Sequence, residues 1–449
     1  MSSSLQHRVA EPRWGGARRA VSIVVAAWLV AVAAKAGDPQ AGPNRQVVIP
    51  VQASDPVRAM VQTGPAFPIA ALAFSPDGKT LAQGGYREVL LWDIEAASLA
   101  RRIGLGAHQQ DGMQGPVRAV VFFKDGTRLA VAEGVAARSG TVRIYDVRSL
   151  QETVVLAGPN DVVYCLAVDP NERRLAAGTA DGKVYVWDAN DGRRLATIDA
   201  HAGWVEGLAF SPDANTLATA GEDKTLRVWE TRTWASKFSI PQAAAVHDVT
   251  YSPDGQFLAV AVGGPQERSV IVQRADVPKR QVAGTASTGA GLPLAVVWAA
   301  KANRIYAACS DATVRVIDGA NRRRLAQLDG HQDWVYGLAV SPDGSRLASG
   351  SADGTVRLWS TADNKLLATL VQAGPGPGAW AIVTPQGYFT ASSADVVQWP
   401  SIAQRNDAGQ VKALLAKKDQ AQADVPKAGV SANAGPVTGP GAGGRNGKP

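Results

Sequence analysis

The sequence predicts an all-β protein, a β-propeller of seven or eight blades, each a sheet of four antiparallel strands. One observation is a turn that reads Ser-Pro-Asp-Gly, or a close variant, about every forty residues. A second is a pair, most often an aromatic residue beside an acid, that follows about fifteen residues later. A period of this length indicates one repeated supersecondary unit, which buries its apolar faces only against its neighbours.

The turns and the pairs can be placed along the chain. Complete turns occupy 75–78, 252–255 and 341–344, and variants occupy 124–126, 211–214 and 384–387. In the fifth unit Gln273-Arg274 replaces the pair. The pairs in the other units are Trp92-Asp93, Tyr145-Asp146, Trp187-Asp188, Trp229-Glu230, Ile317-Asp318 and Trp359-Ser360.

Unit seven shows how one repeat is built. Its first turn is Pro342-Asp343-Gly344, in which proline fixes φ and glycine permits the positive φ of a tight hairpin. Apolar and polar residues alternate only weakly in the inner strands, which indicates that both faces of each sheet are covered, as in a propeller. We expect its four strands at 334–340, 346–351, 355–360 and 365–371.

Over residues 57–399 the chain resembles the WD40-repeat β-propellers. The resemblance rests on a histidine, a hydroxyl, an aspartate and a tryptophan at the positions where that family has a structural side-chain network. These four groups can satisfy one another's hydrogen bonds across one blade, so the resemblance implies a structural role for both histidines. The residues are His201, Thr219, Asp223 and Trp229 in unit four, and His331, Ser349, Asp353 and Trp359 in unit seven.

The number of blades depends on the segment 380–399. Third strands account for seven units, and this segment supplies an eighth, aberrant one. If it pairs with 57–62 the ring has eight blades, and if it packs outside the ring there are seven; we favour eight. We also expect 57–62 to be the N-terminal outer strand that closes the ring, since closure removes exposed strand edges.

The first 36 residues predict a signal peptide. Four arginines precede the apolar run 20–34, which ends in Ala34-Lys35-Ala36, a small-x-small cleavage site. We expect cleavage after Ala36 and a periplasmic or secreted protein, a secreted bacterial-type member of the family. The alternative is an uncleaved membrane anchor with the propeller on the same outer side. The arginines are Arg8, Arg13, Arg18 and Arg19.

The rest of the chain divides by composition. We expect a linker at 37–56, the propeller at 57–399, a possible short helix within 400–424 and a disordered Gly/Pro/Ala-rich tail at 425–449. Without residues 1–36 the formal net charge falls from +7 to +3, because five basic residues and one acid leave with them. So small a charge argues against a nucleic-acid partner.

Enzyme chemistry has little support in the sequence. It contains no Gly-x-Ser-x-Gly elbow, no Gly-rich phosphate loop and no His-x-x-x-His pair. Of five histidines, two belong to the structural network, and His247 beside Asp248 is the one pair that could act in catalysis. Adjacent residues of a strand point to opposite faces, which weakens that pair. We therefore expect no enzyme activity, no cofactor and no metal.

One face of the propeller is the better candidate for binding. The links from fourth to first strand and the turns from second to third strand emerge there, and both classes carry the insertions, which often mark a binding face. Ordinary packing of the rim is the alternative. The candidate partner-binding residues lie near the channel mouth. Tyr164, Glu206, His247 and Tyr336 share one register, Trp204 and Trp334 lie two residues earlier, Asp333 is close by and Glu222 lies in the neighbouring turn.

These features predict a non-catalytic scaffold for protein–protein interaction in the cell envelope or periplasm. The resemblance implies a protein partner without identifying it, because fold alone does not supply function. The alternative is a propeller enzyme, or a protein that binds a small ligand or glycan, with its site at the mouth of the central channel.

Overall fold

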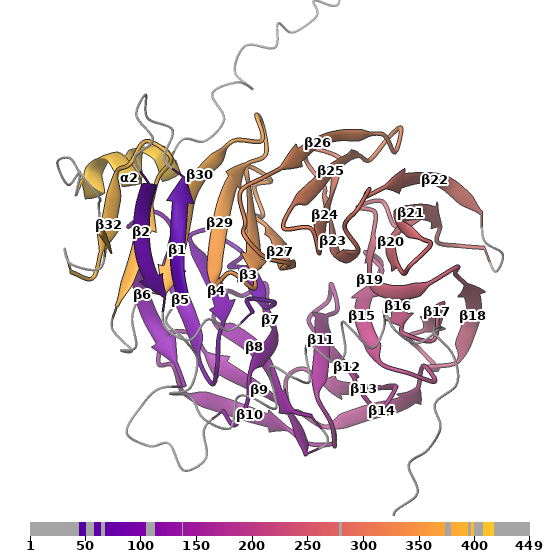
Figure 1. The fold of residues 1–449 in the computed structure, drawn as a ribbon. Helices are drawn as coiled ribbons and strands as arrows, with labels where there is room; N and C mark the ends of the chain where they lie inside the picture. Colours follow the sequence, from indigo (N-terminus) through magenta and orange to yellow (C-terminus); the bar gives the residue numbers. More distant parts are fainter. Residues whose placement is uncertain are drawn as a thin grey trace, which may run out of the picture.

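The computed structural model describes residues 45–50, 58–63, 68–104, 113–136, 138–277, 281–372, 379–393, 397–398 and 407–416. Within these ranges the chain forms seven blades of four antiparallel strands, arranged in a ring and consecutive in sequence (Figure 1). The expected signal peptide at 1–36 and the tail at 425–449 lie outside the described residues. Among those described, no helix is long and apolar enough to cross a membrane.

Each blade uses its strands in chain order, from the first strand at the channel to the fourth at the rim. Blade one has β3 (Leu72–Phe74), β4 (Thr80–Gly84), β5 (Val89–Asp93) and β6 (Ser98–Ile103); blade two has β7 (Val117–Phe122), β8 (Arg128–Val135), β9 (Ser139–Asp146) and β10 (Glu152–Leu156); blade three has β11 (Val163–Val168), β12 (Arg174–Thr179), β13 (Lys183–Asp188) and β14 (Arg194–Asp199); blade four has β15 (Val205–Phe210), β16 (Thr216–Gly221), β17 (Thr225–Glu230) and β18 (Ser236–Pro241).

The remaining three blades follow the same plan. Blade five has β19 (Ala245–Tyr251), β20 (Phe257–Gly263), β21 (Arg268–Arg274) and β22 (Val282–Ser287); blade six has β23 (Pro293–Ala299), β24 (Arg304–Cys309), β25 (Val314–Asp318) and β26 (Arg324–Leu328); blade seven has β27 (Val335–Val340), β28 (Arg346–Ser351), β29 (Thr355–Ser360) and β30 (Leu366–Gln372).

The core lies between neighbouring blades. Every residue of β28 is buried, whereas the outer strand β10 is largely exposed. One apolar cluster joins Tyr306 and Val316 of blade six to Leu347 and Trp359 of blade seven. The weak alternation in the inner strands is thus explained, because each sheet packs on both faces against the next blade.

The ring closes with seven blades, so the preference for eight was wrong. The first strand of blade seven, β27, packs directly beside β3 of blade one. The fourth strand of blade seven is its own β30, which continues outward into β31 (Trp380–Val383) and β32 (Phe389–Ala391). Within the described residues, β31 and β32 therefore extend the sheet of blade seven and form no separate blade.

The expected closure by 57–62 was also wrong. The strand β2 (Arg58–Thr63) pairs with β1 (Arg45–Pro50) and with β33 (Val397–Gln398) in a separate three-stranded sheet. The outer position of blade seven is already filled by β30, so β2 has no edge in the ring to complete. The repeat pattern identified the strand correctly, and this strand does pair within 380–399, through β33, but in a sheet separate from the blades.

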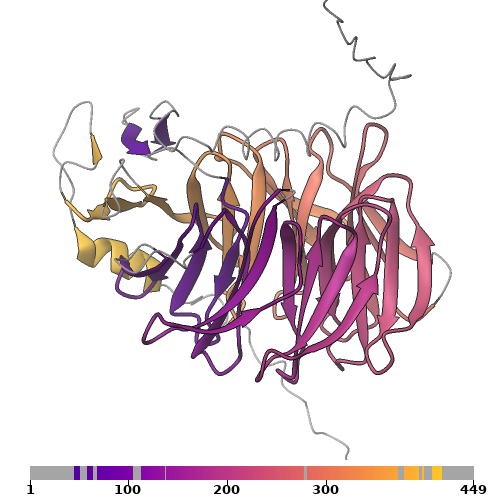
Figure 2. The same ribbon diagram turned by 90° about the horizontal axis from the view of Figure 1, so that it is seen from below.

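C-terminal segments cover the seam between blades one and seven. A helix, α2 (Ala408–Ala416), lies at the outer edge of the ring near β32 and β30 (Figures 1 and 2). Its Val411 and Leu415 are buried in a cluster that includes Trp92 of blade one and Leu370 of blade seven. Trp380 of β31 meets Trp92 edge to face, with ring centroids 6.1 Å apart. The helix lies inside the segment 400–424, where the sequence indicated one.

Candidate functional site

A β-bulge recurs at the same register in the first strand of blades two to seven. In each, one residue near the start of the strand is left between two paired ones, as between Val163 and Cys165 in β11. A bulge re-aims the side chain of the extra residue. The extra residues are Arg118, Tyr164, Glu206, His247, Leu294 and Tyr336.

These six side chains meet in one cavity at the centre of the ring. Its volume is about 250 Å³, and Ala70 of blade one also lines it. Val163 pairs with Thr179, so the start of each first strand lies at the same end as the turn between second and third strands. The cavity therefore opens toward the face where the sequence placed the channel mouth.

Sequence reasoning found four of these positions and missed Arg118 and Leu294. Each bulge residue stands five positions before the residue that aligns with the first serine of the Ser-Pro-Asp-Gly turn. In blades two and six that residue is Phe123 and Ala299 in place of serine, although in blade two the variant turn 124–126 follows. Extending the alignment through these degenerate turns would have placed both residues in the ring.

Two aromatic pairs stand at the mouth. Tyr164 and Trp204 have ring centroids 5.4 Å apart, and Trp334 and Tyr336 are 6.1 Å apart. Burial raises the pKa of Tyr164 to about 12 and also raises that of Tyr336. Both phenols are therefore neutral near pH 7 and present O–H groups within an apolar wall.

An ion pair bridges blades four and five. The Nδ1 atom of His247 lies 2.7 Å from Oε2 of Glu206. Burial by itself lowers the pKa of His247, but the charge and hydrogen bond of Glu206 outweigh it, so the pKa is raised above its ordinary value. The pair thus favours a protonated imidazole beside a carboxylate.

Asp248 also lines the cavity, although it follows His247 directly. The bulge breaks the strict alternation that made the sequence place these two side chains on opposite faces. Its carboxylate accepts N–H bonds from Val249 and from Val296 of blade six, both at 2.8 Å. Burial raises the pKa of Asp248 to about 7. Asp248 therefore links blade five to blade six through its hydrogen bonds to backbone N–H groups.

Arg118 is the basic group of the cavity wall. Its Cζ lies 5.5 Å from the centroid of the Tyr164 ring. In the described part of the chain its Nε is buried without a hydrogen-bond partner. Burial lowers the pKa of Arg118, opposed by nearby Tyr164 and Tyr336.

Three of the eight candidate residues, Glu222, Asp333 and Trp334, lie outside the cavity lining. The N–H of Glu222 donates to the Trp204 carbonyl at 3.0 Å, and burial raises the pKa of the Glu222 carboxyl. Asp333 accepts the N–H of Trp334 at 2.8 Å, which shapes the link into blade seven. The structure therefore brings five of the eight candidates together in the cavity and leaves Glu222, Asp333 and Trp334 around it.

The network residues of blade seven form a continuous chain of hydrogen bonds. Trp359 Nε1 donates to Ser349 Oγ at 2.9 Å, and Ser349 Oγ lies 2.8 Å from His331 Nε2. His331 Nδ1 lies 2.9 Å from Asp353. Burial lowers the pKa of His331, so a neutral imidazole accepts from the serine and donates to the carboxylate.

Blade four repeats this arrangement in its own residues. Trp229 Nε1 donates to Thr219 Oγ1 at 3.0 Å, and that hydroxyl lies 2.8 Å from His201 Nε2. His201 Nδ1 lies 2.9 Å from Asp223. Both histidines therefore take part in contacts within their blades, away from the cavity lining.

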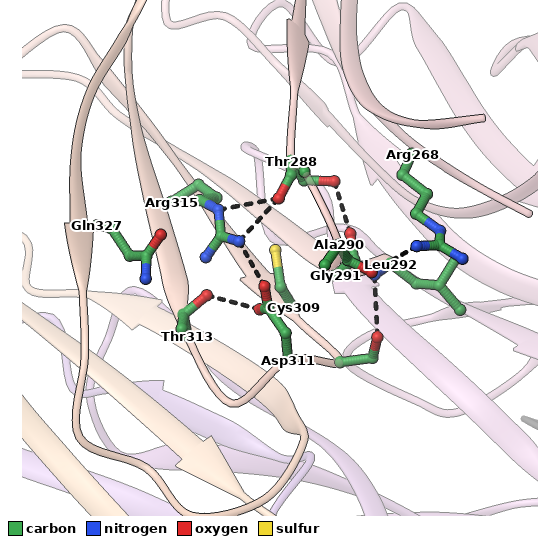
Figure 3. A network of polar contacts seen from close by, with 12 residues as sticks. Arg268, Thr288, Ala290, Gly291, Leu292, Cys309, Asp311, Thr313, Arg315 and Gln327 are labelled. Atoms are coloured by element: carbon green, nitrogen blue, oxygen red, sulfur yellow. Dashed lines mark hydrogen bonds and ion pairs between the residues drawn. The ribbon is translucent and has the colours of Figure 1, made fainter. Parts of the chain in front are cut away.

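Blades six and one form comparable side-chain contacts with different residues. In blade six Arg315 donates from Nε and Nη2 to the Thr288 carbonyl, at 3.0 and 2.7 Å, and also contacts Asp311 (Figure 3). Arg315 thus connects Asp311, in the turn between the second and third strands, to the loop that contains Thr288. The histidine makes the corresponding connection in blades four and seven. In blade one Gln83 accepts the indole N–H of Trp92 at 2.8 Å. Neither substitute was predicted from the sequence.

The described residues contain no group of three or more His, Cys, Asp or Glu side chains arranged to hold a metal ion.

The similarity of this chain to known sequences agrees with the geometry of the blades. The family described as "WD domain, G-beta repeat" matches residues 58–93, 150–188, 192–230 and 322–360. These four segments of the chain are WD40 repeats. The matched segments include both tryptophans of the two complete networks, so the sequence resemblance and the hydrogen-bonded structure agree.

WD40-repeat relatives include eukaryotic proteins. "Periodic tryptophan protein 2 homolog" of Dictyostelium discoideum is 32% identical over 44% of this chain and 21% of its own length. "WD repeat-containing protein slp1" of Schizosaccharomyces pombe is 24% identical over 62% of this chain and 55% of its own. The chain therefore spans about a fifth to about half of these relatives.

A solved structure shares the fold. A chain in "Crystal Structure of Mitotic Checkpoint Complex" aligns with a TM-score of 0.59 and 22% identity, over 73% of this WD40 protein and 97% of that chain. At this identity the similarity establishes the propeller architecture.

Proposed function

We propose that this WD40-repeat protein is a non-catalytic scaffold that binds a protein partner at the mouth of its central channel. The observation that carries the proposal is a cavity open to solvent that is lined by the six bulge residues and flanked by two aromatic pairs. Tyrosine and tryptophan are enriched where protein interfaces gain most of their binding energy. The similar solved chain is part of a mitotic checkpoint complex, which supports a role in assembly.

Site-specific photocrosslinking tests this proposal. A benzoylphenylalanine placed at Trp334 should capture the partner in cells, because this position lies beside the cavity. The same group at Asp254, in an exposed turn on the opposite face, should not. Equal capture at both positions, or at neither, would overturn binding at the mouth.

A triple variant provides a second test. Replacing Glu206, Trp334 and Tyr336 with alanine removes one charge and two aromatic rings from the mouth. We expect the captured partner to be lost from a pull-down with this variant, while Asp254→Ala retains it. An unchanged pull-down would exclude these residues from the interface.

We also propose that the protein works in the cell envelope or periplasm after cleavage behind Ala36. The proposal rests on the basic, apolar and small-residue segments at the N-terminus. Fractionation of the source cells, followed by N-terminal sequencing, should find a mature chain that begins at Gly37 outside the cytoplasm. A cytoplasmic protein with an intact N-terminus would refute the export hypothesis.

The competing hypothesis is an enzyme or a protein that binds a small ligand or glycan. The volume of the cavity, about 250 Å³, favours it as the second candidate, since that space accommodates a small molecule. Native mass spectrometry of protein purified from its source separates the two hypotheses. A bound metabolite or sugar, lost in the triple variant, would favour the competing one.

A further inference from the structure

Within the described residues, Arg118 is the one charged side chain of the cavity wall that has neither an ionic partner nor hydrogen bonds to its charged group. Among the other charged lining groups, Glu206 and His247 pair with each other, and Asp248 is held by two backbone N–H groups. Arg118 has a buried Nε without a hydrogen-bond partner in that part of the chain. A guanidinium keeps its proton in proteins, and burying an unpaired charge is costly.

The surroundings of Arg118 suit a planar anion. The Tyr164 ring lies beneath the guanidinium at 5.5 Å, and Trp204 packs on that ring. Tyr336 lines the same cavity from blade seven, and the small Ala70 between blades seven and two leaves space beside Arg118. A guanidinium binds carboxylates through a fork of two parallel N–H donors, and aromatic walls that reduce solvent access strengthen such bonds.

The opposite side of the cavity limits the charge of the anion. Glu206 and Asp248 line it there, and Glu222 lies close enough for its pKa to be raised by Glu206 after the larger effect of burial. A second negative charge on the ligand would be repelled by these carboxylates. A singly charged carboxylate therefore fits better than a phosphate dianion.

We propose that Arg118 binds one carboxylate group in the channel mouth, presented by an acidic side chain of a polypeptide or by a free organic acid. This inference rests on the proposed function in that it uses the same mouth. It adds the chemical class that the site recognises and the residue that recognises it.

Isothermal titration calorimetry with defined probes tests the proposal. The acid probes are the peptide acetyl-Gly-Glu-Gly-amide and phenylacetate, each compared with its neutral twin, the Gln peptide and phenylacetamide. We expect the acids to bind more tightly than their twins, and Arg118→Gln to weaken acid binding about 10- to 100-fold, as for lost charge-assisted hydrogen bonds. Tighter binding of the peptide identifies a polypeptide ligand, and tighter binding of phenylacetate identifies a free acid.

Three results would overturn the carboxylate site. They are equal binding of acid and neutral twin, equal acid binding by wild type and R118Q, and tighter binding of inorganic phosphate than of either acid. The matched control is Arg232→Gln, which removes an arginine whose side chain is 82% exposed and should leave binding unchanged. Arg118→Lys keeps the charge without the fork and should bind with intermediate affinity.

The stability of R118Q separates ligand binding from a structural role. Removing an unpaired buried charge should leave the Tm of the free protein unchanged or higher, whereas loss of a structural arginine would lower it. If R118Q does not fold, the comparison of acid with neutral twin on the wild type decides, and equal binding refutes the site.

Failure of this inference differs from failure of the scaffold hypothesis. If a partner is captured at position 334 but R118Q does not weaken acid binding, the scaffold hypothesis is retained and the carboxylate site is overturned. Acid binding that depends on Arg118, with no captured protein, retains the site and overturns the protein partner.

Discussion

The Nδ1 atom of His247 lies 2.7 Å from Oε2 of Glu206, and this contact joins blade five to blade four at the channel mouth. Burial opposes protonation of His247, yet the carboxylate raises its pKa above the ordinary 6.5. The folded protein therefore holds this proton more tightly than the unfolded chain does. The stability that the pair contributes is complete below about pH 6.5 and is lost as the pH rises through the folded-state pKa.

Glu206→Gln should lower the pKa of His247 below its ordinary value. The substitution removes the charge that favours the imidazolium and leaves burial as the main effect. Titration of the assigned histidine Cε1–H resonance by NMR measures this change. Glu95→Gln, at an exposed ion pair with Lys79, is the control and should leave His247 unaffected. An unchanged pKa in E206Q would show that the contact does not persist in solution.

Asp248→Asn should change how stability depends on pH. The folded-state pKa of Asp248 is about 7, above its ordinary 3.8, because burial disfavours the charge. Its contribution is therefore fully present below about pH 4 and is lost as the pH rises to 7, on the order of a few kcal/mol. Asparagine does not titrate but leaves one backbone N–H unpaired, which costs about 1–3 kcal/mol.

Guanidinium denaturation at several pH values measures this effect. D248N should be less stable than the wild type at pH 4, and the difference should shrink or reverse by pH 8. A difference that stays constant over this range would contradict the raised pKa.

Ser349→Ala removes one hydroxyl from blade seven and should clearly lower the free energy of unfolding. The hydroxyl is the shared partner of the Trp359 indole and the His331 ring, and all three side chains are buried. Leaving each buried group unpaired costs about 1–3 kcal/mol. Denaturant titration should show a lower midpoint with an unchanged m-value. Ser236→Ala, on an exposed position of β18, should change the free energy of unfolding by less than about 0.5 kcal/mol, and an equal effect would refute the network's importance.

The sequence could predict the parts of the site that follow from the repeat. Tyr164, Glu206, His247 and Tyr336 share one register because each stands five residues before the position that aligns with the first serine of the turn. Arg118 was missed although the variant turn 124–126 follows it at the same spacing. A bulge is a tertiary feature, so the placement of His247 and Asp248 on one cavity could not follow from strand alternation.

The closure of the ring shows where periodicity fails. The segment 57–62 has the pattern of an outer strand, and the family profile includes it in a repeat. Whether it joins a blade depends on which strand reaches the open edge, and β30 fills that edge from within blade seven. Competition between two strands for one edge is settled by packing, which local sequence does not encode.

Leu415→Ala should weaken the seam between blades one and seven. Leu415 is 1% exposed and packs in a cluster that contains Trp92 and Leu370, from the two blades that close the ring. Because no strand is exchanged between these blades, their contact depends on side-chain packing and on the C-terminal cover. Truncating a buried leucine costs about 2–5 kcal/mol, and hydrogen exchange should increase first in β3 and β27 if the seam opens locally. Lys412→Ala, exposed on the same helix, is the control, and equal exchange in both variants would show that α2 does not hold the ring closed.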